Sequence, residues 1–265
     1  MLERGFNMFS LNEQRAIELG EAGEKAVREQ DDYSAVQNIE YLREFGQELL
    51  EADLETDLKR VIISVRNIGS KGIQKKMENV ASESVNVLNT LSEGALEKNY
   101  SNALWSFSKA VQEIGKGAVQ FQMLESAANA LETLRMIGLG AVEKKMEVVT
   151  LWTTLALEEM AYIANRQQLT DFTEKAKTAR EDVIKASEEA GFISRDQIEK
   201  YPQLIAQTVS EFAELKNLQP AGYAGKPNEE FTEDEFYEGE TDEDDSTEEG
   251  EIRESGLEEA KTEKK

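Results

Sequence analysis

The chain has 265 residues and a formal net charge of −24, and it contains neither cysteine nor histidine. These absences exclude disulfides, thiol nucleophiles, imidazole bases and the usual zinc sites. The length allows one or two domains, and the negative charge argues against direct binding to nucleic acid, because such affinity depends on clusters of basic residues.

A period of 23 residues runs through the sequence without insertion or deletion. Its seven copies start at Ala22, Phe45, Ile68, Leu91, Ile114, Ile137 and Met160. In each copy the second residue is small, and a Leu or Val commonly lies three residues before the first. Apolar residues spaced three and four apart lie on one face of a helix. The period therefore predicts one helix of roughly 18 residues per copy, and short connections favour antiparallel neighbours.

The second position of each copy is glycine in five of the seven copies. A glycine inside a helix costs about 1 kcal/mol relative to alanine, so its recurrence needs a structural reason. Either the missing side chain lets a neighbouring helix pack closely, or the glycine caps the C-terminus of each helix. We favour close packing, because the apolar stripe continues from Ile137 to Ala141. Gly115 and Gly117 predict no nucleotide site, since no strand precedes them and the phosphate-loop motifs are absent.

The chain is predicted to begin with a lead-in over residues 1–10, followed by a helical-repeat array over residues 11–190. Ser10 and Glu13 form a capping-box pattern that starts the first helix near Leu11. The expected helices cover 11–29, 33–51, 56–75, 79–98, 101–121, 124–144, 146–168 and 171–190. Polar residues that can cap helices mark the expected breaks. The repeat fades after Gln168, and the polar eighth helix is typical of a terminal cap.

Residues 191–218 are predicted to form C-terminal capping helices. Ser194 and Gln197 repeat the capping-box pattern, and an apolar stripe follows over residues 203–218. Residues 219–265 are predicted to form a linker and a disordered acidic tail, with fifteen acids and one base between Glu229 and Glu254. The tail lacks the glycine and the final glutamate of an EF-hand loop, so no calcium site is predicted.

Five aromatic residues are candidates for partner binding: Trp105, Trp152, Phe231, Phe236 and Tyr237. The two tryptophans fall beside the core stripe of their copies. They either line one flank of the array and anchor a peptide, or are partly buried against the next helix. The three tail residues lie among carboxylates, which either dock on a basic partner or only keep the chain in solution.

The repeat resembles α-solenoid proteins of the HEAT, armadillo and tetratricopeptide type, because two 23-residue units make a hairpin of 46 residues. It lacks the W-x2-L-G-x2-Y pattern of tetratricopeptide repeats and the proline of HEAT repeats. The resemblance implies an all-α fold, either an α-solenoid or an elongated bundle of seven to eight antiparallel helices, that binds proteins on an extended surface. It implies no functional residues.

We therefore expect a non-enzymatic scaffold that binds a protein or peptide partner, with no catalytic residue, cofactor or metal. One alternative is an acidic tail that binds or chaperones a basic protein. Another is a small-ligand-binding or enzymatic all-α domain. No apolar h-region lies within residues 1–20 and no window approaches 18 apolar residues, so neither a signal peptide nor a transmembrane helix is predicted, and the expected location is cytoplasmic.

Overall fold

The computed structural model describes residues 10–201, and eight helices account for most of them. The helices are α1 (Leu11–Arg28), α2 (Asp32–Glu51), α3 (Glu55–Gln74), α4 (Glu78–Glu97), α5 (Ser101–Gln120), α6 (Leu124–Glu143), α7 (Glu147–Arg166) and α8 (Thr170–Glu189). From α3 onward, each helix starts 23 residues after the one before it, so the sequence period is the structural repeat. The predictions for residues 1–9, 203–218 and 219–265 lie outside the described residues.

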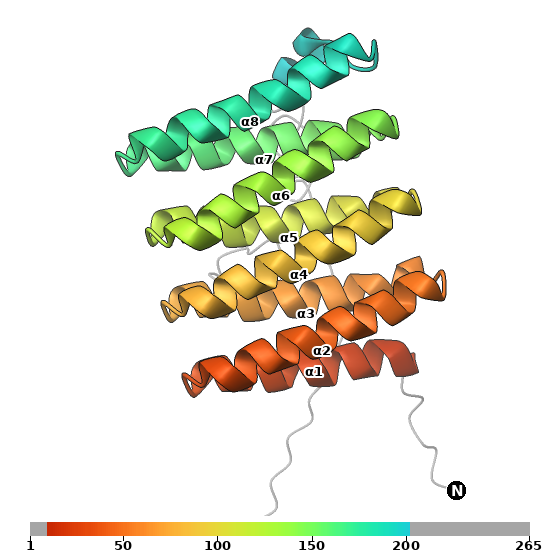
Figure 1. The fold of residues 1–265 in the computed structure, drawn as a ribbon, viewed down its shortest axis with the longest axis vertical. Coiled ribbons are helices and arrows are strands. Elements are labelled where there is room, and N and C mark those ends of the chain that lie inside the picture. Colours follow the sequence, from red (N-terminus) through yellow and green to blue (C-terminus); the bar gives the residue numbers. More distant parts are fainter. Residues whose placement is uncertain (1–9, 202–265) are drawn as a thin grey trace, which may run out of the picture. The chain divides into compact units, whose positions relative to one another are not determined.

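The helices form two layers (Figure 1). Helices α1, α3, α5 and α7 pack side by side in what we call the odd layer, and α2, α4, α6 and α8 form the even layer. Each helix also packs against its sequence neighbours in the other layer. Among these eight helices, α1 contacts only α2 and α3, and α8 contacts only α6 and α7. The stack is therefore open, which confirms the all-α repeat and identifies it as an α-solenoid.

The second-position glycines lie inside helices and are sites of close packing. A Cβ on Gly69 would lie 2.7 Å from Cδ1 of Ile114, and one on Gly46 would lie 2.7 Å from Cδ1 of Leu91. Each contacting residue comes 45 positions later and belongs to the next helix of the same layer. The same step joins Gly23 to Ile68, Gly115 to Met160 and Gly138 to Val183. The close-packing interpretation is confirmed, and the C-cap alternative is wrong.

The helices end in a recurring hydrogen-bonded turn. After α3, the N–H of Met77 donates to the carbonyl of Gly72 (2.9 Å) and the N–H of Lys76 to that of Ile73 (3.0 Å). This is the Schellman motif, in which the residue after the C-cap is left-handed. Lys76 takes this conformation (φ +59°). Six more non-glycine residues take it at 23-residue intervals: Gln30, Asp53, Asn99, Gln122, Lys145 and Gln168.

The prediction that polar residues cap the breaks is correct only for the first two helices. Ser10 and Asp31 accept hydrogen bonds at the starts of α1 and α2. From α3 onward the N-cap is apolar or aromatic and forms no side-chain cap: Leu54, Met77, Tyr100, Met123, Met146 and Leu169. The reason is that the same residue also ends the preceding Schellman turn, where an apolar contact accompanies the motif. Met77 and Met123 are accordingly buried.

The repeat does not fade after Gln168, contrary to the prediction. Helix α8 starts in register, and Gly191 takes the left-handed turn conformation 23 residues after Gln168. Val183 and Ile184 of α8 are fully buried although the helix is largely polar. A helix as polar as α8 keeps the repeat because its packing needs only one apolar stripe.

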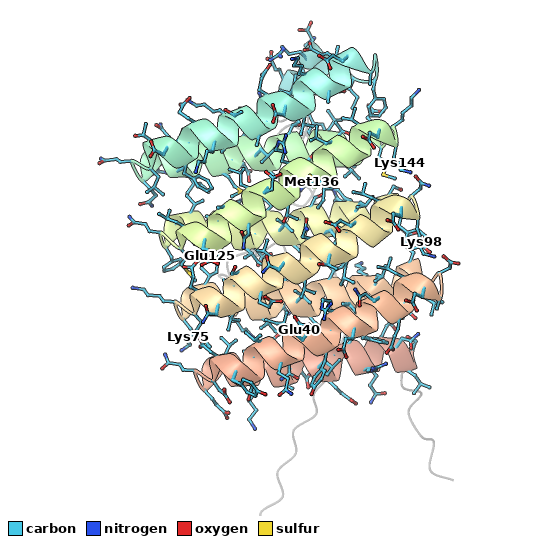
Figure 2. All side chains as sticks on the ribbon, viewed as in Figure 1. Glu40, Lys75, Lys98, Glu125, Met136 and Lys144 are labelled. Carbon is cyan, nitrogen blue, oxygen red and sulfur yellow. The ribbon has the colours of Figure 1, made fainter. Side chains whose placement is uncertain are left out.

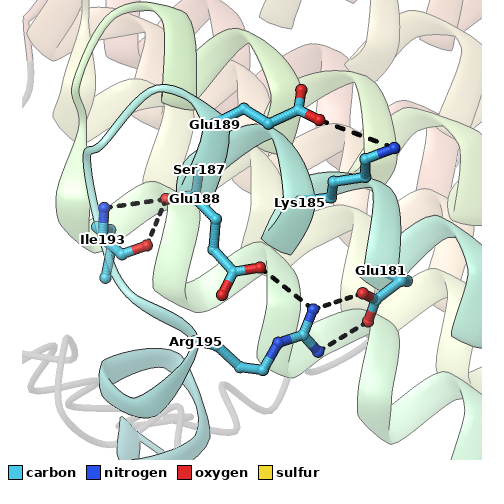
Figure 3. A network of polar contacts seen from close by, with 7 residues as sticks. All are labelled: Glu181, Lys185, Ser187, Glu188, Glu189, Ile193 and Arg195. Atoms are coloured by element: carbon cyan, nitrogen blue, oxygen red, sulfur yellow. Dashed lines mark hydrogen bonds and ion pairs between the residues drawn. The ribbon is translucent and has the colours of Figure 1, made fainter.

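The segment after α8 packs against α7 and α8, and Figure 3 shows its polar contacts with α8. Leu151, Ile184, Ile193 and Ile198 form a small apolar cluster there. Arg195, which starts a further helical segment, donates to both carboxylate oxygens of Glu181 and to Glu188 (3.3 Å). The hydrogen bond from Arg195 lowers the pKa of the Glu181 carboxyl. This segment thereby covers Leu151 of α7.

Candidate protein-binding surface

The two layers differ in charge. The odd-layer helices α1, α3, α5 and α7 carry net charges of −1, +2, +1 and −2, which cancel. The even-layer helices α2, α4, α6 and α8 carry −4, −4, −2 and −2, a total of −12. Helix α4 contains four glutamates and no basic residue. Figure 2 labels Glu40, Glu125 and Met136 on the even layer.

Acidic side chains crowd one another on the even layer. Glu83 of α4 lies beside Glu40 of α2. Burial, and then the hydrogen bond with Glu40, raise the pKa of Glu83. Arg43 compensates in part, because its Nη2 lies 2.6 Å from a carboxylate oxygen of Glu40. This layer therefore opposes the approach of an acidic partner.

The odd layer brings together the two predicted tryptophans. Trp105 of α5 and Trp152 of α7 meet edge to face, with ring centroids 5.9 Å apart and an interplanar angle of 76°. The Nζ atom of Lys109 lies 4.8 Å from the Trp105 centroid and 5.7 Å from that of Trp152, within cation–π range. Both tryptophans are partly buried. Their role in binding stays a prediction, and Phe231, Phe236 and Tyr237 lie outside the described residues.

A hollow of about 690 Å³ opens beside Trp105. It lies between the α4–α5 turn and the α6–α7 turn, and we call it the α5–α7 hollow. Its lining consists of Asn99, Ser101, Asn102, Trp105, Lys144, Lys145, Met146, Glu147, Val148 and Val149. Val148 is 57% exposed, so the hollow has an apolar wall that faces solvent. Trp105 contributes to this lining, whereas Trp152 does not.

The hollow lies at a copy of the repeat in which a serine begins the helix, where two earlier copies have a glutamate. In α3, the first residue is Glu55, and its Oε1 accepts a hydrogen bond from the backbone N–H of Ala103 on α5 (3.2 Å). In α4, Glu78 accepts from the backbone N–H of Ser126 on α6 (2.9 Å). In α5 the first residue is Ser101, and within residues 10–201 it forms no such bond to α7.

A second hollow also lies at a copy whose first helical residue is not a glutamate. The first residue of α6 is Leu124, and a hollow of about 860 Å³ opens between α6 and α8, where Leu124 and Phe172 contribute to the lining. Neither hollow was predicted from the sequence. The signal was present, since the 23-residue alignment places Ser101 and Leu124 in the column that holds Glu55 and Glu78. The consequence of losing the glutamate becomes clear only when the neighbouring helices are known.

Comparison with known proteins adds information on the fold. No protein-family model matches the chain, and no curated protein matches it. Two solved structures with the titles "DHF46 filament" and "DHF91 filament" are similar, with TM-scores of 0.52 and 0.50. Their sequences are 11% and 13% identical, and the alignments cover 66% and 68% of this chain and 98% and 97% of those chains. At these identities, the likeness concerns the helical fold alone.

Within residues 10–201, none of the helices is long and apolar enough to cross a membrane. Nor does that part of the chain hold a group of three or more Asp and Glu side chains arranged to bind a metal ion.

Proposed function

We propose that the protein is a non-enzymatic helical-repeat scaffold of the cytoplasm that binds a protein or peptide partner on the odd layer, at Trp105 and the α5–α7 hollow. The observation that carries the proposal is the hollow itself. It combines an aromatic wall, an exposed valine and two lysines on the turns of a rigid stack.

Interface chemistry supports this location. Binding hot spots are enriched in tryptophan and gather where a side chain enters a pocket from which water is excluded. Trp105 is held by its contact with Trp152 and by packing against the core, so little side-chain entropy is lost when a partner covers it. Electrostatics add to this preference, because the charges of the odd-layer helices sum to zero whereas those of the even-layer helices sum to −12.

The alternative of a tail that binds a basic protein rests on residues 219–265. Those residues lie outside the described part of the chain, and the alternative stays a prediction.

A matched pair of substitutions tests the proposed surface. Peptides would first be selected from a random display library against the full chain. Val148→Glu places a charge in the hollow of the odd layer, and Met136→Glu places one at an exposed position of the even layer, where Met136 is 43% exposed. We expect Val148→Glu to weaken the selected peptides by about tenfold or more and Met136→Glu to leave their affinity unchanged. Equal effects, or a loss with Met136→Glu alone, would overturn the proposal.

A further inference from the structure

We propose that the α5–α7 hollow recognises an acidic peptide segment, in which one carboxylate occupies the place left empty by Ser101 and an adjacent apolar side chain packs on Trp105 and Val148. This inference rests on the proposed function and names the class of partner.

The repeat itself shows which chemical group fits this place. At the equivalent position between α3 and α5, the occupant is the carboxylate of Glu55, and between α4 and α6 it is the carboxylate of Glu78. Both accept a hydrogen bond from the third residue of the helix two positions on. Between α5 and α7, the equivalent donor is the backbone N–H of Val149, which lines the hollow. A carboxylate supplied by a partner would restore the arrangement of the two earlier repeats.

The charges around the hollow favour the same group. Lys144 and Lys145 line it from the α6–α7 turn, and both are exposed. Neither lysine forms an ion pair within residues 10–201, whereas Lys98 of the neighbouring α4–α5 turn is paired with Asp53. In Figure 2, Lys98 and Lys144 mark these two turns. Glu147 is the one acid of the lining. The two lysines therefore leave a local excess of positive charge on a chain whose net charge is −24.

The second hollow serves as an internal contrast. Between α6 and α8, the place of the glutamate is taken by Leu124, and the donor position is Phe172. Asp171, Glu174 and Asp182 also line that hollow, with Arg135 and Lys175. Arg135 is already engaged, because its Nε donates to Asp182 at 2.8 Å. Charge complementarity therefore directs an acidic segment to the α5–α7 hollow and away from the α6–α8 hollow.

The test compares two synthetic peptides with blocked termini, one with glutamates on both sides of a phenylalanine and the other with glutamines instead. Their binding to the full chain is measured by calorimetry and by tryptophan fluorescence, which reports on this surface because the chain has only two tryptophans. We expect the glutamate peptide to bind about tenfold tighter than the glutamine peptide. Its affinity should fall as ionic strength rises.

Two substitutions that restore the glutamate of the repeat give the matched control. Ser101→Glu fills the α5–α7 hollow and should weaken the glutamate peptide by about tenfold. Leu124→Glu makes the same change in the α6–α8 hollow and should leave the affinity unchanged. Both variants supply the acceptor used by Glu55 and Glu78, so we expect neither to lower the melting temperature.

Three outcomes would overturn the inference: equal affinity for the two peptides, full affinity in Ser101→Glu, or an equal loss in Leu124→Glu. If display-selected peptides still depend on Val148 while the glutamate and glutamine peptides bind alike, the scaffold function stands and the acidic partner is wrong. If no selected peptide depends on Val148, the proposed function itself fails.

Discussion

The odd and even layers share one packing scheme and differ in what they present to solvent. Gly69 of α3 receives Ile114 in the odd layer as Gly46 of α2 receives Leu91 in the even layer. Outside the core, the odd helices sum to zero charge and the even helices to −12. A 23-residue repeat fixes the buried positions of every copy, whereas the outward positions vary between alternate copies. Surface properties of such a chain are therefore best compared across steps of 46 residues.

The largest expected effect tests whether the packing scheme is truly shared. Gly115→Leu in the odd layer and Gly46→Leu in the even layer should each lower the free energy of unfolding by about 1–3 kcal/mol, because overpacking strains a dense core. Gly115 should be the more sensitive, since a Cβ there would lie 2.8 Å from Cβ of Ala130, which cannot rotate away. Thr90→Leu at an exposed site is the control in a thermal unfolding series. An unchanged melting temperature for Gly115→Leu would contradict this account of the core.

The next prediction concerns the turns at the ends of both layers. Lys76 and Gln122 follow odd-layer helices, and Asn99 follows an even-layer helix, all with left-handed φ values between 58° and 60°. This conformation costs an L-residue roughly 1–2 kcal/mol, and glycine avoids that cost but loses more entropy on folding. Each change to glycine should therefore stabilise the chain by about 0.5–1 kcal/mol. Loss of stability at all three sites in denaturant titrations would show that their side chains matter more than the backbone.

A smaller effect distinguishes the acidic layer by its pH dependence. The pKa of the Glu83 carboxyl is raised in the folded chain above the ordinary value of 4.5, so the folded state binds a proton there more tightly than the unfolded state does. The folded state therefore loses stability as the pH rises from 4.5 through the raised pKa. Glu83→Gln should stabilise the chain by about 0.5 kcal/mol at neutral pH, after allowance for solvent screening, with no gain below pH 4.5.

The effect of pH on stability is opposite for Glu181. Its pKa is lowered by Arg195, so its contribution is present above the unfolded pKa and is lost as pH falls. Glu181→Gln should destabilise at neutral pH and have little effect in acid. The melting temperatures of Glu83→Gln and Glu181→Gln are measured at a series of pH values. The same pH dependence in both variants would contradict the opposite pKa shifts of the two carboxyls.

The last prediction concerns the odd layer. Lys109→Ala removes the cation above Trp105 and Trp152 and should cost about 0.5–1 kcal/mol, as cation–π contacts at exposed sites do. Tryptophan emission should change with it. Lys25→Ala on α1 of the same layer, a helix that contacts neither α5 nor α7, is the control and should leave the emission unchanged.

The sequence predicted the fold well because the period is expressed in every copy. The apolar spacing predicts the helices and their boundaries to within about two residues. It also predicts close packing at Gly115. The layers could not be read from the period alone, because the step of 23 does not say whether a helix packs on the next helix or the one after.

The site was predicted only in part for the same reason. Trp105 and Trp152 are 47 residues apart, and the same step joins Gln112 to Glu159 across α5 and α7. Their contact becomes evident once the neighbours are known. The sequence alone does not show the role of Ser101. Ser101 is notable only because Glu55, at the equivalent position of α3, accepts a hydrogen bond from the backbone N–H of Ala103 on α5.

The most direct test of the central claim is hydrogen–deuterium exchange of the full chain with and without a display-selected peptide. We predict that protection appears in residues 99–109 and 144–152, which flank the α5–α7 hollow of the odd layer, and that residues 124–139 and 170–182 of the even layer exchange unchanged. Protection confined to the even-layer segments would contradict the account.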